Sequence, residues 1–472
     1  MSAPQRSLAA AQQEPLAVQQ DLAGWGRHPV ERCRVHRPES LEGLQELVAR
    51  APGSLIARGL GRSYGDAALN PAGVVLGRRL DRMLAFDPAR GVLHCEAGVS
   101  LAEILDVFLP RGFFFPVTPG TKHITVGGAI AADVHGKNHH ASGSMSAFVE
   151  DLRLLVASGE IVTCSAAERP ELFWATVGGM GLTGVVVEAR LRLRPVTTAF
   201  MAVDVRRARN LDELLTLGAD DRDYEYGVAW IDCLAARGAL GRSVLLRANH
   251  AEPAALPAAR AATPLVAPAP LRPRVPFPFP NFALNAWSVR AFNEVIYRTQ
   301  SGGSHLSSAD VYFYPLDAVK GWNLIYGRRG MLQYQVVLPP ATAREGLVEL
   351  LEALSASGRA SFLAVLKTFG PASSGLLSFP GPGVTLALDL PYTGPDLVAM
   401  LRRLDAGVAR RGGRVYLAKD ACLLPELFAQ MYPGAARFRE VKAKVDPEGR
   451  FASSQARRLG LVESGGVGPE AP

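Results

Sequence analysis

Three glycine-rich segments in the first half of this 472-residue chain each lie next to a predicted strand. They span residues 57–66, 119–140 and 171–184. Glycine allows the backbone to turn tightly and to present its N–H groups to an anion. One such segment alone is often an ordinary turn, and the third could simply end a helix. Three together favour a binding site for an extended dinucleotide between two lobes.

Length indicates the number of domains, and net charge limits the kinds of partner that the chain can bind. The chain is longer than the ~250–300 residues at which single cores stop growing, so we expect two domains. The net charge of +7 is compatible with a diphosphate cofactor, an acidic lipid surface or nucleic acid. No Lys/Arg run and no RNA-binding signature occur, so nucleic acid is not expected as a partner.

The cysteines and the N-terminus bear on the cellular compartment. No CxxC motif occurs, and the spacing argues against structural zinc and a disulfide framework, which favours a reducing compartment. Residues 1–20 lack the apolar core of a signal peptide, and no stretch approaches the ~20 apolar residues of a spanning helix. We therefore expect a cytoplasmic protein or one peripheral on the cell membrane. The cysteines are Cys33, Cys95, Cys164, Cys233 and Cys422.

Short strands and helices alternate in the first half, which indicates an α+β domain. Ser40 and Ser100 occupy expected helix N-cap positions. The Pro/Ala-rich residues 251–282 cannot form regular sheet ladders, and we interpret them as a mobile loop over a cleft or an interaction arm. Later strands are expected at 312–314, 333–337, 361–367 and 384–390.

The first two glycine-rich segments carry polar groups that suit ligand binding. Arg58 and Arg62 add charge to the first, which has neither the Walker nor the Rossmann spacing. The second ends in a cluster that is either a hydrogen-bonded loop or a metal site. No metal is expected, because Asp133 is the only acidic residue near it. The cluster consists of His135, Lys137, Asn138, His139 and His140.

The motifs GLGRSYGD, PGT, TVGGAIA, HGKNHH and ELFWATVGG, in this order, resemble the FAD-binding half of the vanillyl-alcohol oxidase superfamily. The ending from Lys444 to Leu459 resembles its sugar and aldonolactone oxidases. More closely, GWGR, HGKNHH, LQYQ, SFLAVLKTFG and LAKD resemble the flavoprotein oxidase subunits of decaprenylphosphoryl-β-D-ribose 2′-epimerase. This resemblance extends over residues 24–459.

The resemblance implies an α+β fold, with a two-lobed FAD-binding domain of the PCMH type and an inserted α+β substrate domain. The substrate domain would be an antiparallel sheet flanked by helices. The expected division is a flexible tail at 1–20, the FAD-binding domain at 21–196, the substrate domain at 197–412, a C-terminal return to the FAD-binding domain at 413–460 and a flexible tail at 461–472.

The same resemblance implies which residues bind the cofactor, with Arg58 to Tyr64 around the FAD diphosphate. Many superfamily members attach the flavin to a histidine in this loop. Arg62 stands at that place here, so we expect non-covalent FAD. The implied cofactor residues are Ala57, Arg58, Gly59, Leu60, Gly61, Arg62, Ser63, Tyr64, Gly120, Thr125, Val126, Gly127, Gly128, His135, Gly136, Lys137, Asn138, Val186 and Tyr416.

Oxidation of a hydroxyl requires a hydride acceptor and a group that takes the hydroxyl proton. Lys419 is the main candidate for the proton, and Tyr64 and His135 follow. An ion pair between Lys419 and Asp420, or another surface acid, is the structural alternative. The expected substrate-binding residues, any of which could instead be structural, are Lys137, Gln333, Gln335, Lys367, Thr385, Ala387, Lys419, Trp230 and Tyr314.

The chain departs from the family pattern at two of these positions. In the best-known members a cysteine stands in the place of Ala387 and is captured by covalent nitroaromatic inhibitors, and an asparagine stands in the place of Thr385. Alanine has no nucleophile, so such inhibitors should not bind covalently here. The cysteine is not needed for hydride transfer, so the departure leaves catalysis intact.

The resemblance implies oxidation of the 2′-hydroxyl of a polyprenylphosphoryl-β-D-ribose to the 2′-keto sugar, the first half of epimerisation to the arabinose donor for cell-wall arabinan. An NADH-dependent short-chain reductase would be the second subunit. A soluble alditol or aldonolactone oxidase is the alternative within the same fold. A flavin-free sugar- or lipid-binding scaffold is the alternative outside enzymes, and the intact glycine-rich segments argue against it.

Overall fold

Serine side chains begin the first two helices, as the sequence predicts, in the computed structural model of this chain. Ser40 Oγ accepts a hydrogen bond of 3.1 Å from the N–H of Gly43 at the start of α1 (Leu41–Arg50). Ser100 and Glu103 form a reciprocal capping box at the start of α2 (Leu101–Phe108). The structure describes residues 16–463 except 220–222, 269, 270, 281, 301, 360 and 362.

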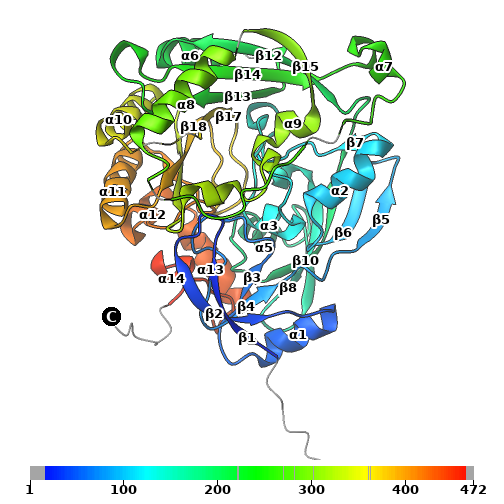
Figure 1. Cartoon of the computed structure of the whole chain (residues 1–472). Coiled ribbons are helices and arrows are strands. Elements are labelled where there is room, and N and C mark those ends of the chain that lie inside the picture. The colour runs from blue at the N-terminus through cyan, green and yellow to red at the C-terminus, as the bar shows by residue number, and fades with distance from the viewer. Residues whose placement is uncertain are drawn as a thin grey trace, which may run out of the picture.

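Two main sheets form the first half of the chain (Figure 1). The first has the order β1 (Val18–Ala23), β2 (Val30–His36), β4 (Val74–Leu76), β3 (Ile56–Arg58). The second has the order β5 (Met83–Asp87), β6 (Val92–Glu96), β10 (Val185–Arg192), β8 (Val149–Leu155), β9 (Ile161–Cys164). The short strands β7 (Phe113–Phe114) and β11 (Arg194–Pro195) pair with each other.

A single eight-stranded sheet dominates the second half, and all its pairings are antiparallel. Helices α6 (Leu211–Ala219), α10 (Ala343–Ser357) and α11 (Pro395–Arg410) pack against its strands. Its order is β15 (Gly303–Ser308), β12 (Phe200–Ala208), β14 (Ser243–His250), β13 (Tyr226–Ile231), β17 (Ala364–Phe369), β18 (Gly383–Pro391), β16 (Met331–Leu338), β19 (Arg414–Val415).

The helices that follow α2 lie around these sheets, as Figure 1 shows. In the first half they are α3 (Val126–Ala131), α4 (His139–Ser142) and α5 (Pro170–Thr176). In the middle they are α6 (Leu211–Ala219), α7 (Ala258–Ala261), α8 (Ala286–Thr299), α9 (Ala309–Phe313) and α10 (Ala343–Ser357). Towards the C-terminus they are α11 (Pro395–Arg410), α12 (Pro425–Met431), α13 (Ala435–Val445) and α14 (Ser454–Arg458).

The C-terminal segment packs against the first half of the chain. The N–H of Leu55 donates to the carbonyl of Arg450 at 2.7 Å, and helix α13 contacts α5. Arg458 forms ion pairs with Asp66 and Asp420, both at 2.8 Å. The same segment also reaches the large sheet, because β19 pairs with β16. Residues 414–420 therefore connect the two halves of the fold.

Three sequence-based expectations about local structure are wrong, and the sequence did not predict the helices in and after residues 251–282. Residues 312–314 belong to α9 and its end rather than to a strand, because Ser308 Oγ caps that helix by accepting from the N–H of Val311. The stretch at 251–282 includes the short helix α7, and α8 follows it unpredicted. The tail predicted for 1–20 is too long, since β1 begins at Val18 and pairs with β2. Residues 1–15 lie outside the described residues.

The tail predicted for 461–472 also begins too early. Leu461 is buried in the main core, and its N–H donates to the carbonyl of Ala456 at 2.8 Å. A residue that packs and hydrogen-bonds in this way extends the folded part of the chain by at least one position. Residues 464–472 lie outside the described residues.

Candidate functional site

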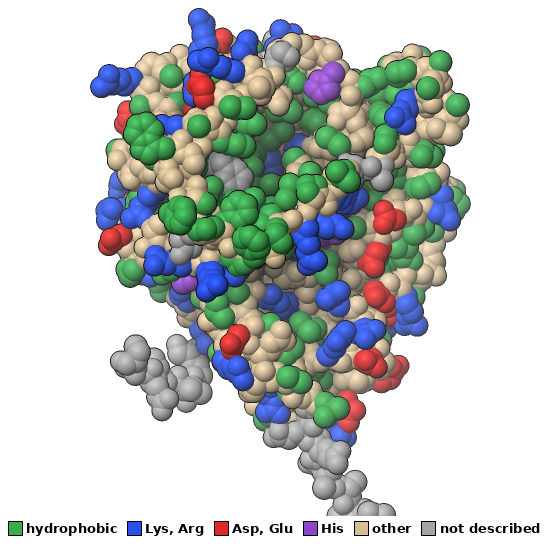
Figure 2. Space-filling view, in the orientation of Figure 1, with side chains coloured by type: hydrophobic (Ala, Val, Ile, Leu, Met, Phe, Trp, Pro, Cys, Tyr) green, Lys and Arg blue, Asp and Glu red, His purple; other side chains and the backbone are tan. Residues whose placement is uncertain are grey.

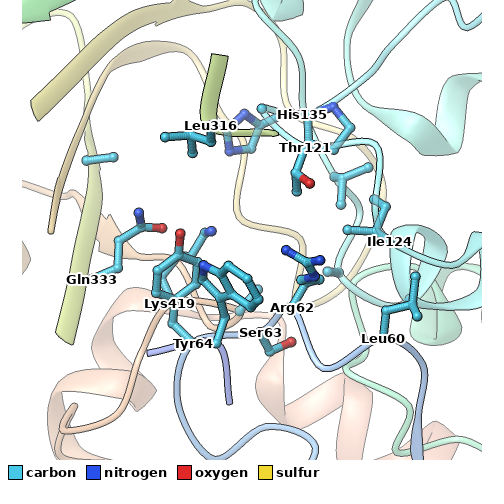
Figure 3. A pocket seen from close by; sticks show the side chains of 18 of the residues that line it. Leu60, Arg62, Ser63, Tyr64, Thr121, Ile124, His135, Leu316, Gln333 and Lys419 are labelled. Carbon is cyan, nitrogen blue, oxygen red and sulfur yellow. The ribbon is translucent and has the colours of Figure 1, made fainter. Parts of the chain in front are cut away.

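A cavity of about 590 Å³ lies between the first two glycine-rich segments and one face of the eight-stranded sheet (Figure 3). All of residues 57–64 contribute to its wall. Small residues from the second segment and from 97–98 line the same region. The opposite wall consists of side chains from β13, β16, β17 and β18.

Close packing between the glycine-rich segments requires glycine at one point. A Cβ atom on Gly59 would lie 2.3 Å from Oγ1 of Thr125, which no side chain tolerates. Thr125 is itself fixed, because its Oγ1 caps α3 by accepting from the N–H of Gly128 at 3.2 Å. The cavity wall here is therefore largely backbone and small side chains, which leaves room for a flat ligand.

The loop from Ala57 to Tyr64 is held by its neighbours on both sides. The N–H of Tyr64 donates to the carbonyl of Ala418 at 2.9 Å. The N–H of Trp25 donates to the carbonyl of Ser63 at 2.7 Å. The guanidinium of Arg62 lies 3.9 Å from the centroid of the Trp25 ring. Burial is the main reason that the pKa of Arg62 is lowered from its ordinary value. Both arginines of this loop border the cavity.

Lys419 lies on the same wall as this loop (Figure 3). Its Nζ atom is 3.9 Å from the centroid of the Tyr64 ring. The pKa of Lys419 is lowered to about 7, mainly by removal from water; the negative charge of Asp389 opposes this shift and the positive charge of Lys367 adds to it. Asp420 instead forms an ion pair with Arg458, so the ion pair between Lys419 and Asp420 is not observed.

Asp389 is a buried carboxylic acid that the sequence reasoning missed. It is fully buried, its Oδ1 accepts a hydrogen bond from Nε2 of Gln333, and burial raises its pKa to about 7. It lies on β18 two residues beyond Ala387, and its register partner on β16 is Gln333. An acidic residue inside an otherwise apolar strand was the signal in the sequence.

His135 and Lys137 reach the cavity from the second glycine-rich segment. Nε2 of His135 lies 3.1 Å from Nε2 of Gln335, which also donates to Oγ1 of Thr385 at 3.2 Å. Burial lowers the pKa of His135 well below its ordinary value, so the imidazole is neutral at physiological pH. Lys137 donates to the carbonyl of Tyr312, and burial lowers its pKa well below its usual range.

Most of the predicted residues meet at this cavity. Those that line it are Ala57, Arg58, Gly59, Leu60, Gly61, Arg62, Ser63, Tyr64, Gly120, Thr125, Gly127, Gly128, His135, Lys137, Val186, Trp230, Gln333, Gln335, Lys367, Thr385, Ala387, Tyr416 and Lys419. Sheet register explains why the expected substrate-binding residues on the strands lie together. Gln335 pairs with Ala387, and Thr385 pairs with Lys367.

Four predicted residues do not line it, and each has a physical reason. Val126 is fully buried in the main core. Gly136 is confined by the backbone of Thr118, which a Cβ would approach to 3.1 Å. The amide of Asn138 donates to the carbonyl of Pro116 at 2.8 Å, behind the cavity wall. The hydroxyl of Tyr314 hydrogen-bonds with that of Thr118 at 2.7 Å instead.

The buried carboxylate beside the histidine cluster is occupied by hydrogen bonds. Asp133 accepts from the hydroxyls of Ser144, Ser373 and Ser378 and from the N–H of Ser146. Within the described part of the chain, no group of three His, Cys, Asp or Glu side chains is arranged to hold a metal ion. Nor does any described helix have the length and apolar character needed to cross a bilayer.

Comparison with known proteins identifies the family. A family model described as an FAD binding domain matches residues 34–165. Decaprenylphosphoryl-beta-D-ribose oxidase of Mycolicibacterium smegmatis is 38% identical to this chain over 451 residues, or 93% of this chain and 97% of that protein. The chain belongs to the decaprenylphosphoryl-β-D-ribose oxidase family. It is an FAD-dependent oxidoreductase with an α+β fold, which confirms both predictions.

Two further relatives are informative about this oxidase family. An uncharacterized protein in the mprA 5′ region of Streptomyces coelicolor is 38% identical over 379 residues, which cover 77% of this chain and 100% of that protein. D-arabinono-1,4-lactone oxidase of Yarrowia lipolytica is 29% identical over only 169 residues, or 34% of this chain and 32% of that protein. The lactone oxidase match is thus confined to about a third of each chain.

The residues present fit FAD, the cofactor of this oxidase family. The narrow cradle of Gly59 and Thr125 and the small residues around it suit a flat ring and an extended dinucleotide. Arg58 and Arg62 place positive charge beside the loop where a diphosphate would lie. Burial is the main cause of the lowered pKa of Arg58, whose guanidinium donates to the carbonyl of Ala23 at 2.6 Å.

Proposed function

We propose that this chain oxidises the 2′-hydroxyl of a polyprenylphosphoryl-β-D-ribose to the 2′-keto sugar, the first half of an epimerisation that leads to the arabinose donor for cell-wall arabinan. The observation that carries this proposal is the position of Lys419. It borders the cavity between residues 57–64, which we propose hold the cofactor, and the polar end of the sheet face. That end consists of the cavity-lining side chains Gln333, Gln335, Lys367 and Thr385. The similarity to the Mycolicibacterium oxidase over 93% of the chain supports the choice of substrate.

Lys419 accepts the hydroxyl proton in this proposal. With a pKa of about 7, a large fraction of the amine is unprotonated at neutral pH and can act as a general base. The ring of Tyr64 restricts where the amine can lie, and Asp389 provides a nearby negative charge once a proton arrives. Bound FAD would supply the acceptor for the hydride from the sugar carbon.

The polar end of the sheet face positions the sugar phosphate. Lys367, whose pKa burial lowers to about 8, is still mostly charged at neutral pH and pairs with the phosphate. Gln333 and Gln335 project from alternate positions of β16 and supply amide groups for the sugar hydroxyls. Lys137 has a different role, because its ammonium is already engaged by the carbonyl of Tyr312. It holds the end of the second glycine-rich segment, which contains the histidine cluster, in place beside the cofactor.

The cofactor is held without a covalent bond in this proposal. Residue 62 in the first glycine-rich segment is an arginine, which cannot form the histidyl link of other superfamily members. Its guanidinium stacks on Trp25 and faces the same cavity. The cofactor-binding part comprises residues 21–196 and 413–460, and the substrate part comprises residues 197–412. The contact of Leu55 with Arg450 supports this division.

Two partners complete the proposal. A separate NADH-dependent short-chain reductase reduces the keto sugar to the arabinose product, because oxidation alone does not invert the centre. Peripheral contact with a membrane brings the lipid substrate to the protein. Apolar side chains gather around a hollow in the face shown in Figure 2. Phe282, just before α8, and Trp287, on α8, are 78% and 80% exposed, so large apolar side chains are available for contact with lipid.

A soluble aldonolactone or alditol oxidase remains the alternative in the same fold. The lactone oxidase match covers 34% of this chain. Such substrates have no apolar portion and do not require the exposed apolar surface.

The test is anaerobic mixing of the purified holoprotein with farnesylphosphoryl ribose while the visible band of oxidised flavin is recorded. Bleaching by this compound, and not by free alditols or lactones, is expected. Bleaching by free polyols alone would move the activity to the soluble oxidases. The absence of a flavin band after addition of FAD would mean that the protein does not bind this cofactor and would contradict the proposal.

A further inference from the structure

The cavity face of the eight-stranded sheet changes from polar to apolar along the strand order. Register pairs place Gln335 opposite Ala387, Ala387 opposite Val365, Val365 opposite Trp230, and Trp230 opposite Val244. These five side chains form one row across β16, β18, β17, β13 and β14, and all of them line the cavity. The polar end of the row adjoins Lys419, and the apolar end points away from it.

The adjacent row has the same gradient. Thr385 pairs with Lys367 at the polar end, while Val228 pairs with Leu246 at the apolar end. Val228 and Leu246 are only partly buried, although they lie on central strands. Their neighbours Ala229 and Leu245, which face the other side of the sheet, are fully packed. An apolar surface is therefore open to the cavity rather than closed by a second layer.

Elements beyond the sheet continue this apolar wall. Ile296 of α8 and Val311 of α9 line the same cavity next to Val203 of the sheet strand β12. The polar residues Gln300, His305 and Ser307 also line the cavity, and His305 is the register partner of Val203. Val311 is 52% exposed, so the wall reaches the surface of the molecule. Figure 1 shows α8 and β15 at that side of the sheet. The cavity thus has a polar end at Lys419 and, beside α8, an exit formed by the apolar Ile296 and Val311 together with polar side chains of β15.

We propose that this apolar half of the sheet face binds the first isoprene units of the substrate's prenyl chain. The proposal rests on the proposed function and adds where the lipid lies and what recognises it. An amphiphile with its phosphate at Lys367 directs its chain over Val365, Val228 and Leu246 and leaves beside Ile296. Three strand spacings separate β17 from β12, roughly 14 Å, so about three isoprene units cover the surface.

Two adjacent residues of α8 provide a matched test. Ile296 is half-buried and lines the cavity, whereas Val295 is 57% exposed and is not among the lining residues. Both are β-branched side chains on the same helix, so substitutions at them perturb helix propensity similarly. Ile296→Asp introduces a charge on the apolar wall, and Val295→Asp is its control. Leu246→Gln on β14 is a second, milder change on the same wall.

The measurement is the dissociation constant of farnesyl phosphate, which lacks the sugar, for the FAD-loaded protein by calorimetry. We expect wild type to bind farnesyl phosphate far more tightly than inorganic phosphate. Ile296→Asp and Leu246→Gln should weaken that binding by about tenfold or more, because they put polar groups against the chain. Val295→Asp should remain within about twofold of wild type.

Two results would overturn the prenyl site. One is wild type that binds farnesyl phosphate no better than inorganic phosphate. The other is unchanged binding in both wall variants. Flavin content and the melting temperature check that each variant is folded. The outcome is separate from that of the proposed function, because a protein that fails to oxidise farnesylphosphoryl ribose can still bind farnesyl phosphate through this wall.

Discussion

The amine of Lys419 lies over the ring of Tyr64, with its Nζ atom 3.9 Å from the ring centroid. The two residues come from opposite ends of the chain, and the N–H of Tyr64 donates to the carbonyl of Ala418, the residue before the lysine. This backbone link fixes the amine relative to the first glycine-rich segment. The proposed base and the loop proposed to hold the cofactor are therefore linked directly to each other.

Replacement of Lys419 by methionine should reduce kcat by about 100-fold or more, because the proton acceptor is lost. FAD binding should persist, since methionine keeps the contact with Tyr64. In the wild type only the neutral amine accepts a proton, so kcat should rise with pH through about 7, the pKa of Lys419. Stopped-flow flavin reduction from pH 5.5 to 9 checks both points. A variant that retains the wild-type pH limb would exclude Lys419 as the base.

Replacement of Asp389 by asparagine should move that pH limb to lower pH. The carboxylate raises the pKa of Lys419, so its removal leaves the amine easier to deprotonate. Asp405→Asn is a matched control. Burial also raises the pKa of Asp405 to about 7, but Asp405 lies on α11 and is not among the charges that shift the pKa of Lys419. The control should alter stability and leave the pH limb in place. Equal shifts in both variants would count against a role for Asp389.

The sequence predicts well which residues of the first two glycine-rich segments meet at the cavity, because their signals are local. Glycines at positions such as 59 are required by close backbone packing, and serines at 40 and 100 cap helices through their own side chains. Asp389 was missed because its burial depends on β17 and Gln333, which are distant in sequence. Helix α9 was missed because aromatic residues also favour strands, and the cap at Ser308 decides the outcome.

FAD should leave the protein upon denaturation. Arginine at position 62 cannot form the histidyl bond, so precipitation with acid should release all of the yellow colour into the supernatant. Absorbance of the supernatant measures the released FAD. Mass spectrometry of the tryptic peptide that contains Ser63 measures any flavin that remains attached to the protein. A peptide that carries the mass of the flavin would show a covalent attachment that the structure does not suggest.

Covalent nitroaromatic inhibitors should add no mass to the wild type, because Ala387 offers no thiol at the cavity wall. The Ala387→Cys variant should acquire one adduct, since position 387 faces the cavity beside Gln335. The five natural cysteines serve as an internal control, because all of them are buried. Modification at any natural cysteine, without modification at position 387, would be inconsistent with this arrangement. Intact-protein mass spectrometry provides the measurement.

Asp133→Asn should destabilise the protein by about 2–4 kcal/mol, because a buried carboxylate that accepts several hydrogen bonds is replaced by a group with one acceptor oxygen. The bonds to Ser373 and Ser378 connect the histidine segment to the loop between β17 and β18. Urea unfolding measures the loss. A change below about 0.5 kcal/mol would mean that these bonds contribute little.

Strand β19 pairs with the large sheet through Val415, and five residues later Asp420 is tied to the C-terminal helix through Arg458. The proposed base therefore lies outside residues 197–412, although it would act on the substrate that this part binds. Recombination that exchanges only the inserted part between relatives changes the sugar and lipid contacts and retains the recipient's own lysine. New substrate ranges can arise in this architecture without the proton-transfer step having to be rebuilt.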